Sequence, residues 1–155
     1  MSYDGNYFDL FLHAQDLYIL GYYYSSIIIC RVATEQALIC ILFKSGKGWD
    51  IYKKNKGNKK LKSIEELAET CRSYALFHNK YPISKISARK VNKISVIASD
   101  LVHPKNDIGE TELYKKQAME CIDRLQFVIN RHLNFIKDTG VTSDYKISDP
   151  PKRLK

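Results

Sequence analysis

The stretch that decides the fold is Tyr22–Lys44, with the sequence YYYSSIIICRVATEQALICILFK. Its β-branched run Ile27–Ile29 would by itself suit a strand. The apolar pattern, however, continues as far as Leu42, which exceeds the usual length of a strand, so we predict a helix from about Tyr22 to Lys44. Gly46 follows closely, in the place where glycine commonly ends a helix.

Four further segments repeat their apolar residues with the helical period. They predict helices over about Tyr7–Leu20, Ser63–His78, Ser84–Val102 and Glu112–Lys137. Ser63 and Glu66 form a capping box at the start of one of them, and Pro104 ends the next. Amphipathic helices with mostly short connections predict an all-α fold, an antiparallel helical bundle of four to five helices.

Length and composition predict one domain over residues 1–140 and a flexible basic tail over 141–155. The four cysteines, at 30, 40, 71 and 121, have neither C-x-x-C nor zinc-ligand spacing, so we expect buried free thiols and no metal. The chain starts without the basic region of a signal peptide, and Arg31 and Glu35 interrupt the apolar stretches. We therefore expect a cytoplasmic protein that makes no membrane contact, and the motifs indicate no cofactor.

Positive charge is concentrated in residues 44–62, which hold eight lysines against the single acidic residue Asp50. The glycines and asparagines of residues 45–62 predict a mobile loop. A local cationic patch attracts polyanions such as nucleic acid or lipid headgroups. The candidate nucleic-acid contacts are Lys53, Lys54, Lys59 and Lys60. The alternative is a lysine-rich loop that only keeps the surface soluble.

The predicted helix Ser84–Val102 divides into two faces at about 100° per residue. The core face holds Ile86, Val91, Ile94, Ile97, Ala98 and Leu101. The opposite face holds Lys85, Arg89, Lys93, Asp100 and His103. Basic groups there would bind a phosphate backbone, and His103 could transfer protons at neutral pH. The alternative is an ordinary solvated face whose histidine is favoured by the helix dipole.

Two charges interrupt the apolar helix Tyr22–Lys44. Arg31 and Glu35 are four residues apart, so burial of that helix face would force them to pair with each other or with a neighbour. We expect a structural ion pair, with a catalytic contribution from the second helix as the alternative. His13, His78 and His132 have no partner at metal-ligand spacing and are expected to fill amphipathic positions.

These pieces together resemble the HEPN superfamily of helical nucleases and nucleotide-binding domains, over about Phe8 to Ile136. The residues that carry the resemblance are Gly21–Tyr24, Arg31–Leu38 and Asp100–Pro104, followed by the long last helix. Active members have an Arg, four to six residues, and then a His at this helix end. The resemblance implies metal-independent RNA cleavage, in which the ribose 2′-hydroxyl attacks the adjacent phosphate, in a cleft between two protomers.

His103 matches this pattern, and Asp100 matches the polar residue inside it. The positions where the Arg would stand, Val96 to Ala98, are not cationic. Stabilisation of transition-state charge is commonly worth about 100-fold or more, so the missing Arg matters for catalysis.

Three hypotheses of function follow. The first is a non-catalytic HEPN-like module, associated with RNA or a nucleotide, homodimeric, and an accessory of a defence or toxin–antitoxin type system. The second is a metal-independent endoribonuclease in which His103 works with a displaced cation such as Arg89, Lys93 or Arg31. The third is a helical scaffold for a protein partner.

Overall fold

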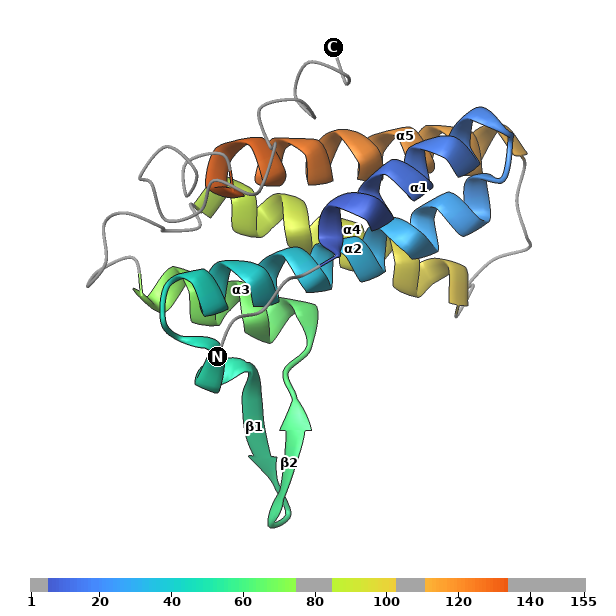
Figure 1. The fold of residues 1–155 in the computed structure, drawn as a ribbon. Coiled ribbons are helices and arrows are strands. Elements are labelled where there is room, and N and C mark those ends of the chain that lie inside the picture. The colour runs from blue at the N-terminus through green and yellow to red at the C-terminus, as the bar shows by residue number, and fades with distance from the viewer. Residues whose placement is uncertain (1–5, 75–84, 103–110, 134–155) are drawn as a thin grey trace.

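The computed structural model describes residues 6–74, 85–102 and 111–133. It contains α1 (Tyr7–Ile19), α2 (Tyr23–Lys44), α3 (Ile64–Ser73), α4 (Lys85–Val102) and α5 (Thr111–Val128), and a π-helical turn, Ile129–Leu133, continues α5. These helices pack into a bundle (Figure 1), so the predicted mainly helical fold is confirmed. His78, His103, Pro104 and the predicted tail over 141–155 lie outside the described residues.

Helix α2 is the centre of the bundle. The other four helices all pack against it (Figure 1). Six consecutive residues, Ala37 to Leu42, are buried, so this part of α2 is covered on every side. A helix buried all round has no polar face, which explains why an amphipathic period is hard to find in its sequence.

One described helix, α2, is long and apolar enough to cross a membrane by length and composition. More than half of the apolar stretch is buried by the rest of the bundle. That burial is what a core helix of a folded domain requires.

The predicted helix boundaries are confirmed at two places. Gly21 has a φ of +87°, and the N–H of Tyr22 donates to the carbonyl of Leu17 at 2.8 Å, which ends α1 close to the predicted Leu20. At the start of α3, Ser63 Oγ accepts from the Glu66 N–H and Glu66 Oε1 accepts from the Ser63 N–H, each at 3.2 Å. The capping box therefore forms as the sequence predicts.

The prediction of a mobile loop over residues 45–62 is wrong. This segment contains the short 3-10 helix η1 (Gly48–Ile51) and an antiparallel β-hairpin of β1 (Tyr52–Asn55) and β2 (Asn58–Leu61). Lys56 and Gly57, at the turn, have φ values of +51° and +85°. Positive φ at both central residues is the hairpin turn whose twist matches the strands. The hairpin projects away from the bundle (Figure 1).

The core face predicted for α4 is confirmed except at one residue. Val91, Ile94, Ile97 and Ala98 are buried, and Leu101 is half-buried. Ile86 is instead 56% exposed. It lies in the first turn of α4, at the margin of the apolar face, where the described helices leave it uncovered.

All four cysteines are buried free thiols, as predicted. Burial raises the pKa of the Cys71 and Cys121 thiols to about 12, and it raises the pKa of Cys30 as well. The thiols are therefore neutral packing groups at physiological pH. Among the described residues no cluster of His, Cys, Asp and Glu could hold a metal ion.

Candidate nucleic-acid interface

The hairpin sets lysines directly opposite lysines. The register pairs are Tyr52 with Leu61, Lys53 with Lys60, Lys54 with Lys59, and Asn55 with Asn58. Because successive side chains of a strand point to opposite faces, each face of the hairpin carries one lysine pair. Like charges directly across a strand pair are destabilising. The hairpin therefore holds a charge arrangement that works against its own stability.

Most of this charge has no acidic partner. Residues 52–61 hold five lysines and no acidic residue. Lys53 pairs with Glu66 of α3, at an Nζ–Oε1 distance of 2.7 Å. The others, Lys54, Lys56, Lys59 and Lys60, are exposed and make no ion pair with the described part of the chain.

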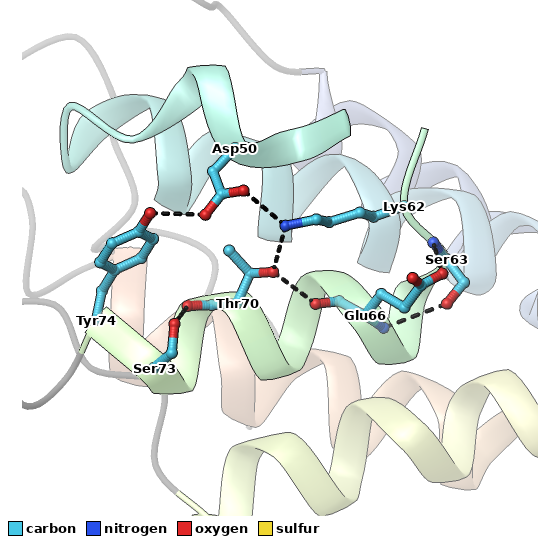
Figure 2. A network of polar contacts seen from close by, with 7 residues as sticks. All are labelled: Asp50, Lys62, Ser63, Glu66, Thr70, Ser73 and Tyr74. Atoms are coloured by element: carbon cyan, nitrogen blue, oxygen red, sulfur yellow. Dashed lines mark hydrogen bonds and ion pairs between the residues drawn. The ribbon is translucent and has the colours of Figure 1, made fainter. Parts of the chain in front are cut away.

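Four side chains, which we call the clamp, fix the base of the hairpin (Figure 2). They are Asp50, Lys62, Thr70 and Tyr74. Lys62 Nζ donates to Asp50 Oδ1 at 2.7 Å and to Thr70 Oγ1 at 3.0 Å, and the Tyr74 hydroxyl donates to Asp50 Oδ2 at 2.6 Å. The Lys62 N–H also donates to the carbonyl of Ile51 at 2.9 Å. The clamp joins the two ends of the hairpin to each other and to α3.

The clamp keeps Asp50 ionised and Tyr74 neutral near neutral pH. Burial by itself would raise the pKa of Asp50, but hydrogen bonds from Lys62 and Tyr74 outweigh it and lower that pKa. Burial and the Asp50 carboxylate together raise the pKa of Tyr74 to about 12. The carboxylate therefore stays charged, and the phenol keeps the proton that it donates.

The basic face predicted for α4 is exposed where the structure describes it. Arg89, Lys93 and Asp100 all lie on the solvent side, and Val96, 49% exposed, shares that side with them. The side chain of Lys85 and the whole of His103 lie outside the description. The hairpin projects beyond the bundle (Figure 1), whereas these residues belong to α4, a helix of the bundle itself.

Of the two alternatives predicted for Arg31 and Glu35, pairing with each other or with a neighbour, the first is wrong. Arg31 is exposed, Glu35 is half-buried, and the two form no ion pair. Arg31 and Val32 lie on an exposed face of this turn of α2, while Cys30, Ala33 and Thr34 of the same turn are buried. The Arg31 charge acts instead on Glu65 of α3. Burial alone would raise the Glu65 pKa, but hydrogen bonding, chiefly with Ser95, and the Arg31 charge lower it.

His132 does not merely fill an amphipathic position. Its Nε2 lies 2.7 Å from Ser87 Oγ of α4, and both residues are buried. This contact ties the π-helical turn after α5 to α4. A partner 45 positions away leaves no local signal in a sequence. His13, by contrast, is exposed on α1.

The bundle also exposes an apolar surface. It lies around the α1–α2 turn and the start of α5, and its members are Ile19, Leu20, Tyr22, Tyr24 and Leu113. Tyr24 packs edge-on against Tyr114, with ring centroids 6.4 Å apart, which brings the two helix starts together. Exposed apolar patches of this kind are typical of protein–protein contacts.

The chain matches no protein-family model, no curated protein and no solved structure. The HEPN resemblance therefore rests on the quoted residues of the sequence.

We expect Lys62→Met to loosen the hairpin base, because it leaves the Asp50 carboxylate without its cation. The cost should be about 1–3 kcal/mol, as for a lost hydrogen bond to a charged group. Urea unfolding of the variant and the parent measures it. The matched control is Lys54→Met, which removes an exposed lysine without an acidic partner and should change stability little. Equal effects of the two substitutions would contradict the clamp.

Glu66 should titrate far below an ordinary glutamate. The Lys53 ammonium and the Ser63 N–H hydrogen-bond its carboxylate and lower its pKa from 4.5 to about 2. Because the folded-state pKa is the lower one, the contact stabilises the fold above pH 4.5, and this contribution is lost as the pH falls toward 2. A ¹³C NMR titration of the Glu66 carboxyl measures the pKa. Lys53→Met should move it part of the way back to 4.5, and an unmoved value would rule out the ion pair as the main cause.

Proposed function

We propose that this protein is a non-catalytic, HEPN-like RNA-associated module that binds a phosphate backbone through the lysine hairpin, residues 52–61. One observation carries the proposal: two pairs of lysines face each other across the strands, and three of these four lysines, Lys54, Lys59 and Lys60, have no acidic partner in the described chain. A phosphate strand laid along the hairpin would supply the missing negative charge. Neutralising phosphates also releases counterions, which favours binding at moderate salt.

The clamp favours a binding role for the lysines over a role in solubility alone. Lysines that only keep a surface soluble can occupy a loose segment and stay apart from one another. Here the clamp of Asp50, Lys62, Thr70 and Tyr74 holds the hairpin base in place. Charges held close together before the ligand arrives cost less to order on binding.

The proposed lack of catalysis is supported by the helical phase of α4. Of the positions where active HEPN proteins have their Arg, Ile97 and Ala98 are buried in the core. A guanidinium at either position would have to be buried without a partner. Val96 is exposed but apolar. The motif therefore lacks its cation at all three positions, and at two of them, Ile97 and Ala98, the side chain also lies in the core. A role as an accessory of a defence or toxin–antitoxin type system fits such a binding module.

A second candidate function, a scaffold for protein contacts, is favoured by the apolar surface around the α1–α2 turn. We propose a second copy of this chain as its occupant, because the HEPN resemblance implies a homodimer. The two functions are compatible, since the apolar surface and the hairpin involve different residues.

Removal of one exposed lysine pair should weaken RNA binding and its salt dependence. A plot of log affinity against log salt concentration has a negative slope. The double variant Lys54→Gln with Lys59→Gln should make that slope shallower by about 1.4, because each single-strand phosphate contact contributes about 0.7. Fluorescence anisotropy with a labelled RNA over a series of salt concentrations measures the slope. Lys115→Gln with Lys116→Gln, an exposed pair on α5, makes the same charge change and is the control. Identical slopes for the two double variants would mean that the hairpin lysines only solubilise.

The purified protein should leave labelled RNA intact in the absence of divalent metal. Gel analysis of the incubated RNA checks this, with His103→Ala beside the parent. If the parent cleaves RNA and His103→Ala does not, the binding-module proposal is wrong. The protein is then the endoribonuclease of the second hypothesis, in which Arg89 or Lys93 supplies the cation.

A homodimer through the apolar surface should depend on Leu20, which is 69% exposed. Leu20→Glu buries a charge in such an interface and should shift the mass to that of a monomer. Light scattering on the eluting protein measures the mass. His13→Glu, an exposed change elsewhere on α1, should leave the dimer intact. A monomeric parent at all accessible concentrations would reject the dimer.

A further inference from the structure

Two exposed aromatic rings stand at the base of the hairpin. Trp49, in η1, is 69% exposed, and Tyr52, the first residue of β1, is 49% exposed. Trp49 makes no ring contact with the described residues. Leaving a large ring in water forfeits the stabilisation that burial would give. Neither ring contributes to the core, although both belong to an otherwise well-anchored segment.

The backbone around Trp49 is fixed on both sides. Asp50 belongs to the clamp, and the next residue, Ile51, is buried. On the other side, Gly48 lies so close to the Phe43 ring that a Cβ there would stand 2.6 Å from a ring carbon. The backbone that carries the indole is therefore fixed at the surface, so only the Trp49 side chain has to be ordered when a ligand binds.

Tyr52 shares a face of the hairpin with a lysine pair. Residues two apart on a strand point to the same side, so Tyr52 lies on the side of Lys54, about 7 Å along the strand. The register places Lys59 opposite Lys54 on that same face. One face thus combines an exposed ring with two ammonium groups that have no acidic partner in the described chain.

We propose that this face, together with the Trp49 ring at the base of the hairpin, binds single-stranded nucleic acid, with Lys54 and Lys59 contacting phosphates and unpaired bases stacking on Trp49 and Tyr52. The inference rests on the proposed function and specifies its ligand. Cationic side chains combined with aromatic stacking platforms are how proteins hold single strands without reading sequence. A duplex keeps its bases stacked within the helix, and an RNA duplex has a major groove too narrow for side chains to read.

The arrangement argues against a membrane as the ligand. A hairpin that inserts into a bilayer would carry its rings at the projecting end. Here the tip is Asn55–Asn58, with Lys56 and Gly57 between the asparagines, and the rings lie at the base. The tip offers no apolar side chain to insert.

Trp49 is the only tryptophan of the chain, so its fluorescence reports on the proposed stacking. The full-length protein is titrated with single-stranded oligouridine, the matching oligothymidine, an RNA duplex, inorganic polyphosphate, and vesicles containing phosphatidylserine. Both single strands should quench the emission. Polyphosphate, which has charge but no bases, should compete for the lysines and leave the emission nearly unchanged. The duplex should bind more weakly and quench little.

Substitutions separate stacking from charge. Trp49→Ala and Tyr52→Ala should each weaken binding of labelled oligouridine by about 5- to 150-fold, the range measured for loss of one base–aromatic stack. Trp49→Phe should restore part of the affinity. Met119→Ala, which removes an exposed apolar side chain of α5 that belongs to neither proposed surface, is the control and should leave the affinity unchanged. Circular dichroism of each variant verifies that the bundle is folded.

The outcomes distinguish the two proposals. Single strands that bind without quenching Trp49, together with unchanged affinity in Trp49→Ala, would overturn the stacking inference and leave the RNA-associated function standing. Absence of binding to every nucleic acid would overturn both. Binding to the vesicles alone, with a blue shift of the emission, would overturn both in favour of a lipid surface.

Discussion

The contact on which the proposed interface depends is the ion pair between Lys62 and Asp50. An isolated two-stranded hairpin is marginally stable in water, and this one also opposes lysines across its strands. The pair closes the base of the hairpin, and Thr70 and Tyr74 extend it to α3. Without that anchor the lysines would be a loose cationic segment, which attracts polyanions but cannot present them with fixed contacts.

The two ion pairs divide the lysines of residues 53–62 into two kinds. Lys62 and Lys53 form ion pairs within the protein, with Asp50 and Glu66 respectively. The exposed lysines of the strands and the turn are the ones left for a ligand. A charge count cannot make this division, because the partners lie 12 and 13 positions away along the chain. Neutralising all of the lysines at once would therefore confound structure with binding.

What the sequence predicts well is local. The helical period, the glycine after α1 and the box formed by Ser63 and Glu66 act over a few residues, and the helices begin and end accordingly. Composition predicts a loop where the structure has the hairpin, because lysine and asparagine disfavour strands. The turn at Lys56 and Gly57 was the available signal. The partner of His132 and the exposure of Arg31 depend on how distant helices pack, which no local pattern encodes.

The lysine hairpin departs from the local rules of secondary structure, whereas α4 does not. Natural sequences tend to break local rules at functional sites and compensate elsewhere. The polar face of α4 breaks no rule, since Arg89, Lys93 and Asp100 lie where an amphipathic helix puts its charges. The hairpin breaks two, by building strands from lysines and by aligning their charges, and the clamp is the compensation. A protein that needed only a connection between α2 and α3 would gain nothing from that arrangement, whereas one that binds a polyanion would.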